Sequence, residues 1–459
     1  MGKSSLHIAM YPWFAIGHIT PFLYLSNKLA EKGHTISFFI PTNTGNTQAK
    51  LQHLNLYPDH ITFVPITVPH VDGLPPDAET TLDLPSSLFS HLMTAMDQTE
   101  SHIELLLRDL KPDIVFYDLA CWVPKLTRKL RIKSIYYCVI TTAPVGYALV
   151  PARQRNGYHS ETDFMQPPSG FPVSSIALHV HEARLFNAML NNKFGSDVLF
   201  IDRLFASSDE ADALGYWACR EIEGPCIDYL VSQFEKPVLV SGPILVEPPA
   251  STLEEKWVEW LGSFKAGSVI YCALGSEIKL TKDQFQELVL GFELCSLPFI
   301  AALKPPIGAE SVEAALPEGF EVRIKGKGLV DGGWVPQRLI LGHPSIGCFV
   351  THCGSGSLLE ALRSECQLVT LPQIPDQIIN ARMMANNWKV GVEIEKGEED
   401  GLFTKGSVCK AVRSVMEVDS EVGRLVRANH SKLRGLLLSE DLQSSYIDNF
   451  CQKLTDLVA

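Results

Sequence analysis

Short runs of β-branched and aromatic residues alternate with helix-like segments along almost the whole chain, and this alternation constrains the fold most. Phe22, Leu25 and Leu29 have helical spacing and precede Gly33, so a helix is expected between the first two apolar runs. Strands separated by helices form βαβ units, so the sequence predicts an α/β fold with parallel sheets. The expected strands are 6–12, 35–41, 61–69, 113–118, 134–140, 268–276, 298–304, 346–353 and 367–372.

The length of 459 residues favours two domains, because a single hydrophobic core rarely grows that large. Proline and glycine concentrate around residues 241–250, directly after a short apolar run. We therefore expect a first domain over 1–240, a linker over 241–255 and a second domain over 256–438. The remaining segment, 439–459, has the pattern of an amphipathic helix.

Composition excludes several classes of protein. The chain has 39 basic and 52 acidic residues, a net charge of −13, and no basic run interleaved with aromatics, so nucleic acid is not an expected partner. The 11 cysteines show neither C-x-x-C pairs nor zinc-ligand spacing, which favours free thiols in a reducing compartment. With no secretory signal pattern and no stretch approaching about 18 apolar residues, we expect a soluble cytoplasmic protein without membrane insertion.

Glycine placement limits the possible ligands. No G-x-G-x-x-G pattern joins a strand to a helix, which disfavours a dinucleotide-binding dehydrogenase. The expected strand 346–353 instead runs into a turn of small residues, His352-Cys-Gly354-Ser-Gly356-Ser357, before a helical segment. Backbone N–H groups at such a turn can bind phosphate. Gly275-Ser276 ends another expected strand, so two loops could hold one diphosphate.

A second interpretation of that turn is purely structural. Ser357 and Glu360 have the S-x-x-E spacing of a capping box, and a glycine before a helix can serve the turn alone.

The segment 334–377 resembles the C-terminal signature box of plant family-1 UDP-sugar-dependent glycosyltransferases. Gly17-His18, Asp118 and the loop at 271–276 also follow that family's order, so the resemblance covers essentially the whole chain. The matching positions in the box are Trp334, Pro336, Gln337, His343, Pro344, Gly347, Thr351, His352, Cys353, Gly354, Ser357, Glu360, Pro372, Asp376 and Gln377.

The resemblance implies a GT-B architecture, in which two Rossmann-like domains face each other across a cleft. The acceptor would bind mainly to the first domain and the UDP-sugar mainly to the second, and the C-terminal helix would return to the first domain. Roles carried over from the family assign uracil stacking to Trp334, base or ribose contacts to Val335 and Gln337, ribose hydroxyls to Glu360, diphosphate to Ser276, His352, Gly354 and Ser357, and the donor sugar to Asp376, Gln377 and Thr141.

Two positions of the donor turn depart from the family pattern. Ser355 and Gly356, which the resemblance also places among the donor-binding residues, stand where most plant members have Trp and Asn. The contacts that those larger side chains make with the donor are therefore absent. Together with segments 10–22, 74–81 and 116–124, this variation resembles the branch-forming subgroup. Its members extend a sugar already attached to a flavonoid, an anthocyanin or a terpenoid.

Inverting sugar transfer needs a base for the attacking hydroxyl and stabilisation of the departing diphosphate. His18 follows the first expected strand and Asp118 ends another, so both lie where parallel sheets place ligands. We expect His18 to be the general base and Asp118 to orient its imidazole. Asp376 is the only obvious nucleophile for a retaining reaction, and its family role is hydroxyl binding, so inversion is predicted. Since the chain contains no D-x-D sequence, we expect no metal and no cofactor.

The expected reaction is transfer of glucose to the sugar of a flavonoid or anthocyanin 3-O-glycoside, forming a 2''-O branch. Xylose or rhamnose as the donor sugar and a terpenoid glycoside as acceptor remain alternatives, as does a non-catalytic nucleotide-sugar-binding protein. Phe14, Ile16 and Trp122 are candidate acceptor contacts because they are apolar or aromatic. A monomer is the default expectation.

Overall fold

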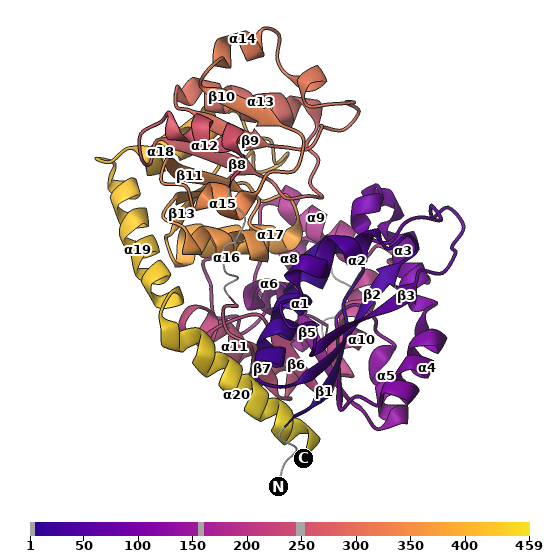
Figure 1. Ribbon diagram of the computed structural model, residues 1–459. Coiled ribbons are helices and arrows are strands. Elements are labelled where there is room, and N and C mark those ends of the chain that lie inside the picture. Colours follow the sequence, from indigo (N-terminus) through magenta and orange to yellow (C-terminus); the bar gives the residue numbers. More distant parts are fainter. Residues whose placement is uncertain (1–4, 155–159, 245–252) are drawn as a thin grey trace.

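The computed structural model describes residues 5–154, 160–244 and 253–459, which form two parallel sheets flanked by helices (Figure 1). The first sheet has seven strands in the order β3-β2-β1-β4-β5-β6-β7, and the second has six in the order β10-β9-β8-β11-β12-β13. We call the parts built on them the first and second lobe. The predicted α/β fold with parallel sheets is therefore confirmed.

The strands are short and mostly buried along their whole length, as in parallel sheets covered by helices on both faces. Their bounds are β1 His7–Tyr11, β2 Thr35–Thr42, β3 Ile61–Thr67, β4 Ile114–Tyr117, β5 Lys133–Cys138, β6 Ala213–Tyr216, β7 Val238–Val240, β8 Val269–Ala273, β9 Phe299–Ala302, β10 Gly328–Asp331, β11 Ile346–Thr351, β12 Gln367–Thr370 and β13 Gly391–Glu393.

The helices connect successive strands or cover the sheets. In the first lobe they are α1 Ile16–Glu31, α2 Asn46–Leu51, α3 Phe89–Asp97, α4 Glu100–Leu110, α5 Val123–Leu130, α6 Thr142–Ala148, α7 Pro151–Gln154, α8 Glu161–Phe164, α9 Val180–Leu190, α10 Phe200–Asp209 and α11 Arg220–Phe234. Later helices are α12 Glu255–Gly262, α13 Lys282–Cys295, α14 Phe320–Ile324, α15 Gln337–Leu341, α16 Ser355–Arg363, α17 Pro375–Arg382, α18 Lys405–Met416, α19 Glu421–Leu437 and α20 Glu440–Val458.

Side-chain alternation along the central strands separates two cores in each lobe. In β1, Ile8 and Met10 pack with α1 and α20, whereas Ala9 and Tyr11 pack with α3, α4, α5 and α10. In the second lobe one face of the sheet packs with α13 and α18, and the other with α12, α15 and α16. Within the part of the chain that the structure describes, no helix combines the length and apolar character needed to cross a bilayer.

The last two helices run along both lobes (Figure 1). Leu437 of α19 packs in the core of the second lobe, and His430 of the same helix is buried there beside the Leu362 carbonyl. The next helix, α20, lies on the first lobe, where Phe450 and Leu454 join the core beneath β1.

Successive strands are added toward one edge of each sheet and then, after one crossover, toward the other edge. The order places β1 beside β4 in the first sheet and β8 beside β11 in the second. Ligands of open α/β sheets bind where connections leave in opposite directions from the carboxyl ends of neighbouring strands. The loops that follow β1, β4, β8 and β11 are therefore the ones placed to form a site.

Each strand expected from the sequence is present, and a capping box of Thr281 and Gln284 begins α13. Four strands escaped prediction: β6, β7, β10 and β13. Each has at most four residues, which is too few for a readable alternation. Residues 151–171 include α7 and α8, and Phe164 there is buried; 155–159 are outside the described residues. Most of the expected linker, 245–252, also lies outside them.

Candidate active site

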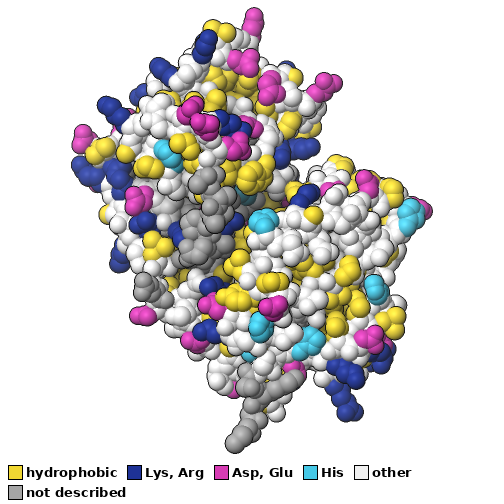
Figure 2. All heavy atoms as spheres, viewed as in Figure 1, with side chains coloured by type: hydrophobic (Ala, Val, Ile, Leu, Met, Phe, Trp, Pro, Cys, Tyr) yellow, Lys and Arg dark blue, Asp and Glu magenta, His cyan; other side chains and the backbone are white. Residues whose placement is uncertain are grey.

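A cleft of about 2000 Å³ separates the carboxyl ends of the two sheets. Residues of both lobes line it, including the loops after β1, β8 and β11, and Figure 2 shows the surface hollowed between the lobes. The cleft therefore combines the two reversal points identified from the strand order.

His18 and Asp118 meet at the first-lobe side of this cleft. His18 lies in the first turn of α1, and Asp118 follows β4. The imidazole Nδ1 lies 2.6 Å from Asp118 Oδ2, while the other carboxylate oxygen accepts hydrogen bonds from the backbone N–H groups of Trp13 (2.7 Å) and Leu119 (2.6 Å). Asp118 is thus held by the chain on both sides, and it leaves Nε2 of His18 for a ligand.

Burial and charge act on His18 in opposite directions. Its side chain is 28% exposed, against 2% for Asp118. Burial alone would lower the pKa of His18, but the Asp118 carboxylate, with smaller contributions from Glu277 and Asp376, raises this pKa above its ordinary value of 6.5. The imidazole is therefore poised to accept a proton near neutral pH.

On the second-lobe side, the turn after β11 leads into α16 without a side-chain cap. Gly354 is the N-cap residue and α16 begins at Ser355, so Ser357 and Glu360 lie inside the helix. The capping-box interpretation of this pair is therefore wrong. The first backbone N–H groups of a helix have no partner within the helix, so they can donate to an anion.

The His352 ring fits between two glycines. A Cβ atom on Gly275 would lie 2.8 Å from His352 Nε2, and one on Gly354 would lie 2.6 Å from the same atom. Gly275 also has φ of +82°, which disfavours any larger residue. Burial lowers the pKa of His352 to about 4, so the ring is neutral at pH 7. Together these contacts bring the loop after β8, with Ser276, against the start of α16.

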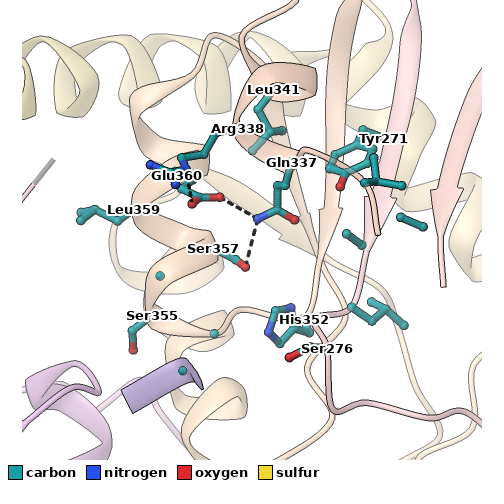
Figure 3. Close-up of a pocket in the computed structure, with 18 of the residues that line it drawn as sticks. Tyr271, Ser276, Gln337, Arg338, Leu341, His352, Ser355, Ser357, Leu359 and Glu360 are labelled. Atoms are coloured by element: carbon teal, nitrogen blue, oxygen red, sulfur yellow. Dashed lines mark hydrogen bonds and ion pairs between the residues drawn. The ribbon is translucent and has the colours of Figure 1, made fainter. Parts of the chain in front are cut away.

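Figure 3 shows a polar group further along α16. The Gln337 amide donates to Glu360 Oε2 (2.8 Å) and to Ser357 Oγ (3.3 Å). The Arg338 guanidinium lies 3.6 Å from the other Glu360 oxygen, and burial raises the pKa of this carboxyl. Nearby, Trp334 is 83% exposed and lines the cleft, so its indole face is open to a ligand, whereas Val335 beside it is buried.

Comparison with known proteins gives the family. Residues 327–430 match the family described as UDP-glucoronosyl and UDP-glucosyl transferase. A cyanidin 3-O-galactoside 2''-O-xylosyltransferase of Actinidia chinensis var. chinensis is 61% identical over 459 residues, covering 100% of both chains. An anthocyanidin 3-O-glucoside 2''-O-glucosyltransferase of Ipomoea nil is 57% identical, covering 99% of each. The chain belongs to the UDP-glycosyltransferase family.

Solved structures agree with this assignment at the level of the fold. A structure of Phytolacca americana UGT2 complexed with UDP-2fluoro-glucose and pterostilbene has a TM-score of 0.78 and 22% identity, covering 98% of this chain and 100% of its own. Glycyrrhiza uralensis UGT73P12, complexed with glycyrrhetinic acid 3-O-monoglucuronide, has a TM-score of 0.80 and 19% identity, covering 99% and 96%. This UDP-glycosyltransferase therefore has the expected GT-B fold.

The residues expected near the donor sugar occupy different positions. Gln377 lines the cleft, and its side-chain oxygen accepts from the backbone of Gln373 (3.0 Å), so the amide nitrogen is left to donate. Asp376 interacts electrostatically with His18, and burial raises its pKa to about 6. Neither Asp376 nor Thr141 is among the described residues that line the cleft, and the Thr141 hydroxyl donates to Asn380 of α17.

The small residues of the donor turn, Ser355 and Gly356, both line the cleft of this UDP-glycosyltransferase. The Ser355 Oγ is buried without a hydrogen-bond partner among the described residues, and a Cβ on Gly356 would meet nothing within 4 Å. The turn therefore keeps open space where most plant members carry larger side chains.

Of the three expected acceptor contacts, the structure brings only Ile16 to the described lining. Phe14 is fully buried in the first-lobe core, and Trp122 packs partly buried against the same core. Trp13, the neighbour of Phe14, lines the cleft instead. Trp13 and Phe14 both lie in the loop before α1, where no regular periodicity indicates which of the two rings faces the cleft.

Proposed function

We propose that this enzyme transfers a sugar, with inversion, from a UDP-sugar to a hydroxyl of the sugar carried by a flavonoid or anthocyanin 3-O-glycoside, forming a 2''-O branch. The relatives support this, because the names of the Actinidia and Ipomoea enzymes specify 2''-O transfer onto a 3-O-glycoside. One of these names gives xylose and the other glucose as the transferred sugar. We keep glucose as the proposed donor sugar.

His18 is the proposed base. Its Nε2 takes the proton of the acceptor hydroxyl while the hydroxyl oxygen bonds to the anomeric carbon. The bond from that carbon to the UDP oxygen breaks with its electron pair on the diphosphate. Asp118 stabilises the imidazolium that forms, and an α-linked UDP-glucose gives a β-glycoside.

Groups of the second lobe are placed to stabilise the departing diphosphate. The backbone N–H groups at the start of α16 and the hydroxyls of Ser276 and Ser357 lie on the cleft opposite His18. Preorganised donors of this kind contribute several kcal/mol when they face a developing anion, on the order of 3 kcal/mol for one donor. We propose that these donors make a metal ion unnecessary.

The His18–Asp118 pair is the observation that carries the catalytic proposal, and replacing His18 by Ala tests it. We expect turnover to fall on the order of 10²–10⁴-fold, because a positioned base contributes that much. UDP affinity, measured by calorimetry, should stay within a few-fold, because the expected nucleotide contacts lie in the second lobe.

His102→Ala is the matched control, since His102 is exposed on α4, away from the cleft. Full turnover in the His18→Ala enzyme would refute His18 as base. Another group in the cleft would then have to act as the base. A non-catalytic nucleotide-sugar-binding protein would bind UDP in both variants and turn over in neither.

A further inference from the structure

The reaction described above does not use Glu277, a carboxylate that reaches across the cleft. Glu277 follows Ser276 in the loop after β8, is exposed, and lines the cleft. Its Oε1 accepts a hydrogen bond of 2.6 Å from the hydroxyl of Thr81, which begins the 3₁₀ helix η2 (Thr81–Asp83) of the first lobe. This contact joins the loop of the donor side to the lobe of the acceptor side.

Thr81 is held firmly in place. It is 2% exposed, and its backbone N–H donates to the carbonyl oxygen of Phe14 (3.0 Å) in the loop that leads to His18. Two residues earlier, the buried Glu79 carboxylate accepts hydrogen bonds from several backbone N–H groups between 43 and 47. Burial alone would raise the pKa of Glu79, but these hydrogen bonds lower it to about 2. The hydroxyl of Thr81 therefore has a fixed position from which to orient Glu277.

The second carboxylate oxygen of Glu277 is left for a ligand. Among the described residues Thr81 is the hydrogen-bond partner of this carboxylate, and no described cation forms an ion pair with it. The negative charge contributes to the raised pKa of the His18 imidazole, and both side chains line the same cleft. Glu277 Oε2 is thus an acceptor-only group on the cleft that also contains His18.

The surroundings decide which ligand suits this oxygen. Trp13, Leu82, Phe89 and Ile278 give the cleft apolar surface, which suits a flat aglycone. A carboxylate next to such a ligand loses water and must find donors, or binding becomes costly. A pyranose ring supplies hydroxyl donors on adjacent carbons, close to the hydroxyl that reacts.

We propose that Glu277, oriented by Thr81, binds hydroxyl groups of the sugar already attached to the acceptor and so selects glycosides over aglycones. This inference rests on the proposed function and adds a specificity-determining residue to it. The donor loop then contributes to recognition of both substrates, because Ser276 faces the diphosphate and Glu277 faces the acceptor.

The test compares Glu277→Gln and Thr81→Val with the wild-type enzyme, using UDP-glucose as donor and cyanidin 3-O-glucoside or cyanidin as acceptor. Rates are compared at the high-pH plateau, where His18 is neutral in every variant. For Glu277→Gln we expect the KM for the glucoside to rise about 10-fold or more, because the amide accepts hydrogen bonds less strongly than the carboxylate. The kcat and the KM for UDP-glucose should stay within a few-fold. Thr81→Val should raise the glucoside KM less, since the carboxylate remains but is no longer oriented.

Asp283→Asn is the control, because it removes a carboxylate from the first turn of α13 on the same lobe, outside the described lining. An unchanged glucoside KM in Glu277→Gln would overturn the inference. A lower kcat with unchanged KM would overturn it too, and would assign Glu277 to the action of His18. Weaker UDP binding would place Glu277 in the donor site instead.

Failure of the proposed function is visible before any variant is made. A wild-type enzyme that uses cyanidin as well as its glucoside, or uses neither, removes the basis for both proposals. If the wild-type enzyme prefers the glucoside and Glu277→Gln has an unchanged KM for it, the inference about Glu277 is wrong but the proposed function stands.

Discussion

The behaviour of His18 follows from the groups fixed around it. Asp118 Oδ1 accepts from two backbone donors, and its Oδ2 lies 2.6 Å from Nδ1 of the imidazole. The hydrogen bond between them places the proton on Nδ1 and leaves the Nε2 lone pair toward the cleft. Asp118 thereby determines both the tautomer and the orientation of the imidazole.

The pH dependence of turnover follows from the sign of the His18 shift. The pKa of this imidazole is raised above 6.5, and only its neutral form accepts a proton, so kcat/KM should fall as pH decreases through that raised pKa. Replacing Asp118 by Asn removes the main charge that raises the pKa. We expect the acidic limb of the kcat/KM profile to move to lower pH and the plateau value to fall. An acidic limb that stays at the same pH in Asp118→Asn would assign it to another group.

At the residue scale, the sequence predicted the positions of side chains that directly follow a strand. His18 and Asp118 could be paired because the connections after β1 and β4 share one edge of the sheet. Phe14 and Trp122 were assigned by chemical type alone, and the structure packs both against the core. Glu277 was missed because its importance comes from Thr81, which lies 196 positions earlier in the chain. A local sequence pattern cannot predict a contact between two lobes.

Among the elements, α16 begins at a turn that is closely packed and also lines the cleft. Its N-terminus faces the cleft without a side-chain cap, and the His352 ring fills the space beside Gly354 and Gly275. The S-x-x-E pattern suggested a helix beginning three residues later, after Ser357 as its N-cap. Spacing alone could not decide between the two starts, because Ser357 and Glu360 are also compatible with the helix interior.

Gly354→Ala tests the close packing at this turn. The added Cβ would lie 2.6 Å from His352 Nε2, so the ring must shift from its place between Gly354 and Gly275. We expect UDP affinity, measured by calorimetry, to fall by about 10-fold or more, since a displacement of this size changes the alignment of several donors. Gly435→Ala in α19 is the control, because a Cβ there meets nothing within 4 Å. Unchanged UDP affinity in Gly354→Ala would show that the turn tolerates movement of the histidine.

In the whole molecule, α17 and the C-terminal helices join the two lobes. Arg382 at the end of α17 forms a buried ion pair with Glu182 of α9 in the first lobe, with distances of 2.8 and 3.0 Å to the two oxygens. Its guanidinium also pairs with Glu393 of β13. Asn380 of the same helix receives the hydrogen bond of Thr141. Because the contacts of Arg382 with Glu182 and of Asn380 with Thr141 cross from one lobe to the other, they connect the stability of each lobe to the arrangement of the cleft.

Replacing Glu182 by Ala tests this connection. Glu182 is 1% exposed and Arg382 is 8% exposed, so the variant leaves a buried guanidinium with one partner instead of two. Removing one member of a buried pair typically costs about 3–5 kcal/mol, although Glu393 should reduce that loss here. We expect a lower free energy of unfolding in denaturant and a calorimetric transition that separates into two, as each lobe unfolds with less support from the other. Glu395→Ala removes an exposed partner of Lys410 within the second lobe and should change neither measurement. A Glu182→Ala enzyme that unfolds in one transition with unchanged midpoint would mean that the pair contributes nothing net, and that α20 on the first-lobe core is what couples the lobes.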